Sequence, residues 1–136
     1  MPNIPNNING VTVEFASSVG KDVNQTLIDG LKHCIKPQVA TGQSLQKIWI
    51  SSASDSHQSP SRHVSGQGVD ISRINGKHIQ TGYTSDAGVK AIVDAIQDTF
   101  ETFAKRRENF GPHLKKKLGS AWTVGGHADH IHLSVN

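Results

Sequence analysis

Cysteine is almost absent from this chain: among its 136 residues, only Cys34 carries a thiol. A single cysteine cannot form an intramolecular disulfide, so the fold must depend on its hydrophobic core and on any metal that it binds. Cys34 falls within an apolar run with helical spacing. This setting predicts a buried structural thiol in preference to a catalytic one.

Long hydrophobic runs are absent as well. No stretch approaches the roughly 18 consecutive apolar residues that a membrane helix needs, which excludes a membrane-spanning protein. Residues 1–9 contain two prolines and four asparagines and lack the basic, apolar and small-residue blocks of a secretory signal. We therefore expect release by lysis, delivery by another secretion route, or a chain that is a fragment of a larger protein.

Internal repeats, low-complexity tracts and interdomain linkers are also missing. A chain of 136 residues is long enough for one domain with a sizeable core and too short for two ordinary ones. We expect a monomer with one domain at residues 10–136, preceded by an irregular lead-in at 1–9.

The charge is mildly basic. A formal net charge of +3 and an isoelectric point near 9.2 favour an anionic partner such as cell-wall polymer, nucleic acid or acidic lipid headgroups. Two basic clusters stand out, at residues 105–107 and 115–117. We interpret both as solvated, the first as the cap of a helix C-terminus rather than as a nucleic-acid patch.

Hydrophobic periodicity indicates an α+β protein. Strand patterns occur at residues 11–15, 45–53, 69–74 and 131–135, and Asn75-Gly76 predicts a hairpin with a short returning strand at 77–80. Helical spacing predicts one helix at 21–35, with room for a short continuation to 42, and a long helix from an N-cap within Thr84-Ser85-Asp86 to about Arg107. We expect a mainly antiparallel sheet with two main helices packed on it.

The first motif with chemical content spans residues 61–70. It places His63 and Asp70 seven residues apart, with Gly66 and Gly68 between them. Histidine and aspartate both bind divalent metals, and the glycines allow the chain to fold back so that the two side chains converge. Two ligands do not make a metal site, so a third must come from elsewhere.

The second motif lies near the end of the chain and contains His127, Asp129, His130 and His132. On a regular strand His130 and His132 project from one face, so that one or both can reach the same metal. Two imidazoles, one carboxylate and one water form the open tetrahedral arrangement of a catalytic zinc site. In a regular strand Asp129 would face away from His132, so a role for Asp129 requires a loop or a bulge before the strand.

Together the two motifs resemble a known family. They read Ser61-x-His63-x-x-Gly66-x-Gly68-x-Asp70 and Asp129-His130-Ile131-His132. The pattern is similar to that of zinc peptidases that include D-alanyl-D-alanine carboxypeptidases, vancomycin-resistance dipeptidases, phage L-alanyl-D-glutamate endopeptidases and the penicillin-insensitive murein endopeptidase. Gly68 stands where alanine is usual, and Trp122 is near but not at the place of a tryptophan that often flanks the second motif. His127, His130 and His132 also match the His-x-x-His-x-His spacing of the murein endopeptidase branch.

The resemblance implies a fold of the lysostaphin, D-Ala-D-Ala peptidase and hedgehog type, and a zinc ion held by His63, Asp70 and His132. It also implies that Asp129 acts as the general base, with His130 and then His127 stabilising the charge on the attacked carbonyl. Because this chain combines the acidic position with the histidine-rich spacing, either histidine is an alternative to Asp129 as the base.

The function that follows is hydrolysis of stem-peptide or crosslink amide bonds in bacterial peptidoglycan, within the periplasm or cell wall. A phage endolysin, a secreted toxin effector and a housekeeping wall enzyme all fit, and so do a carboxypeptidase and an endopeptidase. We expect no nucleic acid partner, and an inhibitor or immunity protein is left open. Candidate substrate contacts are Arg62, Ser61 and Trp122, although Ser61 also suits a turn and Trp122 a partly buried packing position.

Two other functions match part of the sequence. The run Asp129-His130-Ile131 resembles that of ββα-metal nucleases, but those enzymes need a helix with another ligand after it, and here the sequence stops at Asn136. A non-catalytic zinc-containing module that binds a wall or a protein, as in the hedgehog signalling domain, is the stronger alternative. Asp129 favours catalysis, because a purely structural zinc needs no free carboxylate beside it.

Overall fold

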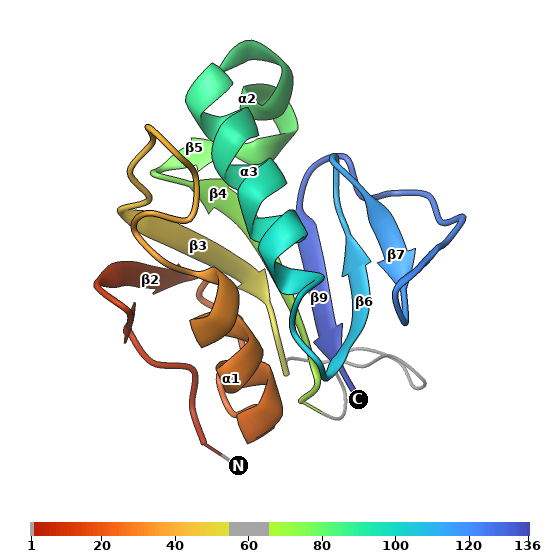
Figure 1. The fold of residues 1–136 in the computed structure, drawn as a ribbon. Coiled ribbons are helices and arrows are strands. Elements are labelled where there is room, and N and C mark those ends of the chain that lie inside the picture. Colours follow the sequence, from red (N-terminus) through yellow and green to blue (C-terminus); the bar gives the residue numbers. More distant parts are fainter. Residues whose placement is uncertain (1, 55–65) are drawn as a thin grey trace.

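The computed structural model describes residues 2–54 and 66–136. These residues form nine strands and three helices (Figure 1). The strands are β1 (Asn7–Ile8), β2 (Val11–Phe15), β3 (Lys47–Ser52), β4 (Gly68–Ile74), β5 (Lys77–His78), β6 (Arg106–Phe110), β7 (Lys115–Lys117), β8 (Ser120–Ala121) and β9 (Ile131–Val135). The helices are α1 (Gln25–Cys34), α2 (Ile79–Ser85) and α3 (Ala87–Phe100).

All nine strands belong to one mixed sheet. Its order is β1-β2-β3-β4-β9-β6-β7-β8, with β5 paired to β4. Only the β2–β3 pairing among the described strands is parallel, and the others are antiparallel. The α+β class and the mostly antiparallel sheet predicted from the sequence are therefore confirmed, although there are three helices rather than two.

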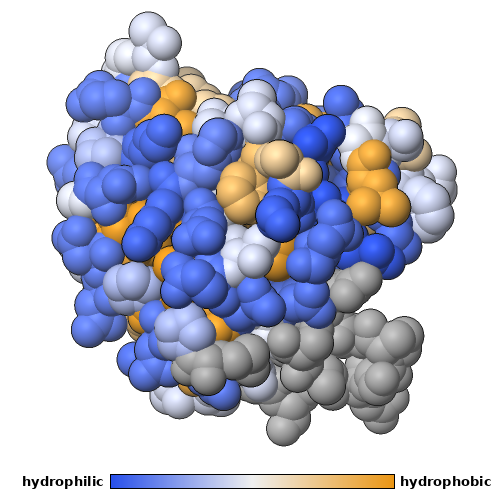
Figure 2. Space-filling view, turned by 60° about the horizontal axis from the view of Figure 1, so that its bottom comes forward, coloured by the Kyte–Doolittle hydropathy of each residue, from blue (hydrophilic) through white to orange (hydrophobic). Residues whose placement is uncertain are grey.

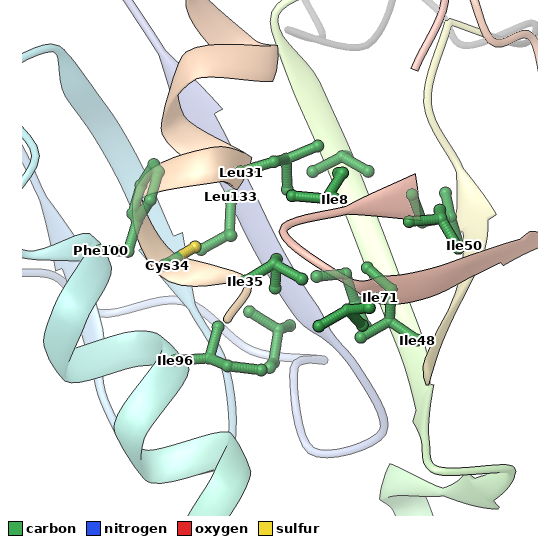
Figure 3. Close-up of a cluster of buried hydrophobic side chains, with 14 of the residues drawn as sticks. Ile8, Leu31, Cys34, Ile35, Ile48, Ile50, Ile71, Ile96, Phe100 and Leu133 are labelled. Atoms are coloured by element: carbon green, nitrogen blue, oxygen red, sulfur yellow. The ribbon is translucent and has the colours of Figure 1, made fainter. Parts of the chain in front are cut away.

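Helices α1 and α3 lie across one face of the sheet (Figure 1). The core between these helices and the sheet is largely aliphatic, and Figure 3 shows its centre, where side chains of both helices meet those of β3, β4 and β9. Cys34 on α1 is buried there, and burial raises the pKa of its thiol to about 12. The prediction of a structural thiol fits this position. Ile4 and Ile8 also belong to this core, although the sequence predicted an irregular lead-in.

Local signals explain where the helices begin. The Asn24 side chain accepts a hydrogen bond from Thr26 N at 2.8 Å, and Asp86 accepts one from Val89 N at 3.0 Å, so that each caps the helix after it. The cap at Asn24 explains why α1 does not begin at residue 21, as the periodicity predicted. The cap at Asp86 confirms the predicted start of α3.

The long helix was predicted to reach Arg107, and this is wrong. Helix α3 ends at Phe100, and the chain turns so that Arg106 begins strand β6. The Arg106 side chain donates from Nη1 to Phe103 O at 3.1 Å and from Nε to Glu101 Oε1 at 3.2 Å, which stabilises this turn. The basic residues that were interpreted as a helix cap therefore lie largely within the sheet.

Two further segments differ from their predictions. The Asn75-Gly76 hairpin is confirmed, with φ of 52° and 78° at its two residues. However, the returning strand stops at His78, because the chain turns at once into α2. Residues 37–42 form turns and not a helical continuation, and Lys115–Lys117 form strand β7, which is half-buried rather than fully solvated.

None of the helices in the described ranges is long and apolar enough to cross a bilayer. The face in Figure 2 is mostly hydrophilic, with small separate hydrophobic patches.

Candidate metal and catalytic site

The site is built where β4 and β9 lie side by side. Asp70 and His132 are directly opposite each other in this antiparallel pair. The Nδ1 atom of His132 lies 2.9 Å from Oδ1 of Asp70. Sheet pairing thus brings together two residues that are 62 positions apart in sequence and that the motifs predicted to share a metal.

The His132 ring is held on its other sides by strand β6. Its Nε2 atom donates to Oε1 of Glu108 at 3.0 Å, and the ring stacks on Phe110 with 5.7 Å between centroids. The same Glu108 oxygen accepts from Ser134 Oγ at 2.9 Å, and the Glu108 backbone N–H donates back to Ser134 Oγ at 3.0 Å. One imidazole is therefore fixed between two carboxylates and an aromatic ring.

These contacts shift both pKa values. Burial alone would lower the pKa of His132, but the hydrogen bonds to Asp70 and Glu108 outweigh it and raise the pKa to about 9. The hydrogen bond from His132 lowers the pKa of Glu108 to about 2, against the opposing effect of its burial. In the metal-free protein at neutral pH, His132 is thus a cation that donates to the Glu108 anion.

Asp129 and His130 form a second pair beside the first. Asp129 lies in a bend before β9 begins at Ile131, as the sequence argument required of a base near His132. Its Oδ1 atom accepts from His130 Nδ1 at 2.6 Å, while His130 Nε2 lies 3.8 Å from Oδ1 of Asp70. His130 therefore stands between the exposed Asp129 carboxylate and the Asp70–His132 pair.

His127 completes the cluster of histidines. Its ring centroid lies 4.9 Å from that of His130 and 6.0 Å from that of His132. Burial lowers its pKa, so at neutral pH the ring is uncharged. Its Nδ1 atom donates to Gly125 O at 2.7 Å, which fixes the tautomer and leaves Nε2 as a proton acceptor.

The donor set suits zinc as far as the structure describes it. A carboxylate oxygen and an imidazole nitrogen converge, and a carboxylate on the far ring nitrogen is the usual support of a metal-binding histidine. The third ligand that the sequence predicted, His63, lies outside the described residues. Within residues 2–54 and 66–136, no group of three or more histidine, cysteine, aspartate or glutamate side chains has an arrangement that could hold a metal ion.

Of the three predicted substrate contacts, the structure describes only Trp122. Ser61 and Arg62 also lie outside the described residues. Trp122 is 49% exposed, so it is a surface side chain rather than a packing anchor. Lys117 Nζ lies 4.6 Å from the centroid of the Trp122 ring. Neither residue is among those that line the cavity beside His127.

Glu108 and Phe110 are the site residues that the motifs did not reveal. Both lie just beyond the predicted helix end at Arg107, in a run where the sequence analysis predicted no strand. The signal was present, because Glu108 and Phe110 alternate with Arg107 and Asn109 and therefore share one face of a strand. A predicted helix that ended near Phe100, as α3 does, would have left residues 106–110 free to be recognised as a strand by this alternation.

Known proteins give no further guide. The chain matches no protein-family model, no curated protein and no solved structure.

Proposed function

We propose that this protein is a zinc-dependent peptidase that cuts peptide bonds in bacterial peptidoglycan. The observation that supports this most is the contact of Asp70 Oδ1 with His132 Nδ1 at 2.9 Å, because the two motifs of the zinc peptidase resemblance meet there. His63, Asp70 and His132 are the proposed ligands. A lysostaphin, D-Ala-D-Ala peptidase or hedgehog type of fold is part of the same proposal.

A bound zinc ion would polarise the scissile carbonyl and lower the pKa of a coordinated water. The protein groups would do the rest. Glu108 and Phe110 hold the His132 ring so that its Nδ1 atom faces Asp70. Asp129, exposed at the bend and one position from His130, is placed to accept a proton from the attacking water and to pass it to the leaving amine.

The two remaining histidines have distinct chemical capacities. His130 donates from Nδ1 to Asp129, so that a carboxylate orients its ring. His127 is neutral, with a free acceptor at Nε2. We assign His130 the stabilisation of the carbonyl oxygen, and keep His127 as the alternative base to Asp129.

The choice of peptidoglycan as substrate rests on the motif resemblance and on the net charge of +3, which suits an anionic wall. The enzyme would act in the periplasm or cell wall, as an endolysin, a delivered toxin or a wall-remodelling enzyme. Mass spectrometry of the released muropeptides would identify the bond that is cut.

The test is hydrolysis of purified peptidoglycan by the zinc-loaded protein. Wild type should release peptides, and Asp129→Ala should lose at least about a hundredfold in rate while it retains zinc, because removal of a general base costs that much or more. Asp29→Ala is the matched control, since Asp29 is an exposed aspartate on α1 far in sequence from the site. If wild type with zinc bound releases no peptide, the peptidase proposal fails and the non-catalytic zinc module is favoured.

A further inference from the structure

A cavity of about 350 Å³ lies beside the histidine cluster. Four segments line it: helix α2, the turn between β6 and β7, the start of β7, and the chain before β9. Gln80, Tyr83 and Thr84 share one side of α2, because they are three and four residues apart, and form one wall. Pro112 and Ala128 are apolar members of the other walls. Its size lies within the usual range of ligand sites, which is about 300–1,000 Å³.

The turn that forms one wall is rigidly held. The buried Gln97 side chain accepts from His113 N at 3.1 Å and from Leu114 N at 3.3 Å, and donates to Leu114 O at 3.0 Å. Gly111 lies against the same amide, where an added Cβ would come 2.5 Å from Gln97 Oε1. The wall is thus formed before any ligand arrives.

The cavity is lined on one side by a cation. Lys115 is half-buried on β7, and its Nζ donates to Val124 O at 2.8 Å. An ammonium has three N–H donors, so this contact leaves two for a ligand. The described residues that line the cavity include no aspartate or glutamate. Its charge therefore favours an anion.

The cavity also adjoins the candidate catalytic groups. His127 lines it and lies 4.9 Å from the His130 ring, measured between centroids. Ala128, another lining residue, immediately precedes Asp129. A molecule bound in the cavity would thus contact His127 and lie close to Asp129, which are the two candidate bases.

We propose that this cavity binds a carboxylate of the peptide substrate, with Lys115 as its ion-pair partner and the α2 wall as its polar lining. The inference rests on the proposed peptidase function and adds to it the position and charge of a substrate subsite. A peptide can offer two sources of this group: its terminal carboxylate or an acidic side chain.

The test measures peptide binding by calorimetry with the zinc-loaded protein carrying Asp129→Ala, which should bind the peptides without cutting them at an appreciable rate. This protein, with its cavity residues unchanged, is the wild type of the comparisons below. The first pair of probes is N-acetyl-D-alanyl-D-alanine and its C-terminal amide, which differ only in the terminal carboxylate. The second pair is the C-terminally amidated dipeptides N-acetyl-L-alanyl-D-glutamate and N-acetyl-L-alanyl-D-glutamine, which differ only in the side-chain carboxylate. Wild type should bind the acid of at least one pair about tenfold more tightly than the amide, as a hydrogen bond to a charged group provides.

Variants of two neighbouring lysines on β7 then test whether Lys115 causes the preference for the acid. Lys115→Met should abolish the preference for the acid and leave amide binding unchanged, and Lys115→Arg should restore it in part. Lys116→Met is the matched control, because it removes the same charge from the next residue, which is also half-buried but points to the opposite face of β7. Thermal melting confirms that each variant is folded.

Three results would overturn the subsite: wild type binds acid and amide equally in both pairs, Lys115→Met keeps the preference, or Lys116→Met loses it to the same extent. This test measures binding and not turnover, so failure of the subsite proposal can be distinguished from failure of the peptidase proposal. In that case wall hydrolysis is absent, while the Lys115-dependent preference for the acid persists.

Discussion

The two faces of β9 are equally buried but for different reasons. Ile131, Leu133 and Val135 face the helices and belong to the aliphatic core. His132 and Ser134 point to the other face and are buried against Glu108 of strand β6. One strand of five residues thus provides the middle of the hydrophobic core and the middle of the candidate site. The difference teaches that burial at this site depends on charged hydrogen bonds, whereas burial on the core face depends on removal of apolar surface from water.

The largest effect on stability is expected from the core face. Leu133→Ala would leave a cavity at a fully buried position and lower the free energy of unfolding by about 2–5 kcal/mol. Urea denaturation of the metal-free protein measures this change. Zinc affinity of the folded fraction should change much less. If zinc affinity instead falls as much as it does for a change at Glu108, the two faces are not independent.

A smaller effect is expected from the site face. Glu108→Gln removes the carboxylate that orients His132, and this should weaken zinc binding about tenfold to a hundredfold, as loss of such supporting groups generally does. Competition with a chromogenic chelator measures the affinity. The control is Glu14→Gln, which removes a carboxylate from an exposed ion pair with Lys47. Equal affinities for Glu108→Gln and wild type would show that Glu108 does not support the metal.

The effect expected to be smallest for a change of one pH unit is the pH dependence of stability, which should come from the site face, where His132 and Glu108 titrate, and not from the apolar core face. The pKa of His132 is raised from 6.5 to about 9, so its stabilising contribution is complete below pH 6.5 and is lost as pH rises through 9. The pKa of Glu108 is lowered from 4.5 to about 2, so its contribution is present above pH 4.5 and is lost as pH falls towards 2. Stability of the metal-free protein should therefore be highest between these limits.

Outside that pH range, the free energy of unfolding can fall only by a limited amount per pH unit. A single titrating group changes the free energy of unfolding by at most about 1.4 kcal/mol per pH unit. Denaturation of chelated wild type and of His132→Gln, compared from pH 6 to 9, isolates the alkaline side. A decline of the same size in both proteins would assign the pH dependence to other groups.

Periodic apolar segments were predictable from sequence, and charged strands were not. Residues 11–15 and 131–135 were recognised as strands, and the start of α3, although not its end, was placed correctly from the cap signal at residues 84–86. Strands β6 and β7 were missed because five of their eight residues are lysine or arginine, so that apolar alternation could not reveal them. Their pairing with β9 and with each other determines their structure, and this is tertiary information that a local pattern lacks.

The candidate site likewise contains features that were predictable from the sequence and features that were not. The motifs predicted that Asp70 and His132 would converge, and that Asp129 would precede the final strand in a bend. They did not indicate that Glu108 holds the far side of His132, because no spacing rule connects β6 to β9. The lining of the cavity was equally hidden, since α2 was expected to be partly a strand and its wall opposite Lys115 is defined only by the fold.

The central place of β9 in the sheet also determines when the core and the candidate site can form during synthesis of the chain. This strand is the last in the described chain, yet it lies between β4 and β6 rather than at an edge. While β9 is still unmade, the emerging polypeptide has a gap in the middle of its sheet, and Asp70 has no His132 beside it. Pairings over such long sequence separations form slowly, because loop closure must precede them. Completion of the core and the contact of Asp70 with His132, on which the proposed zinc site depends, therefore become a single late event.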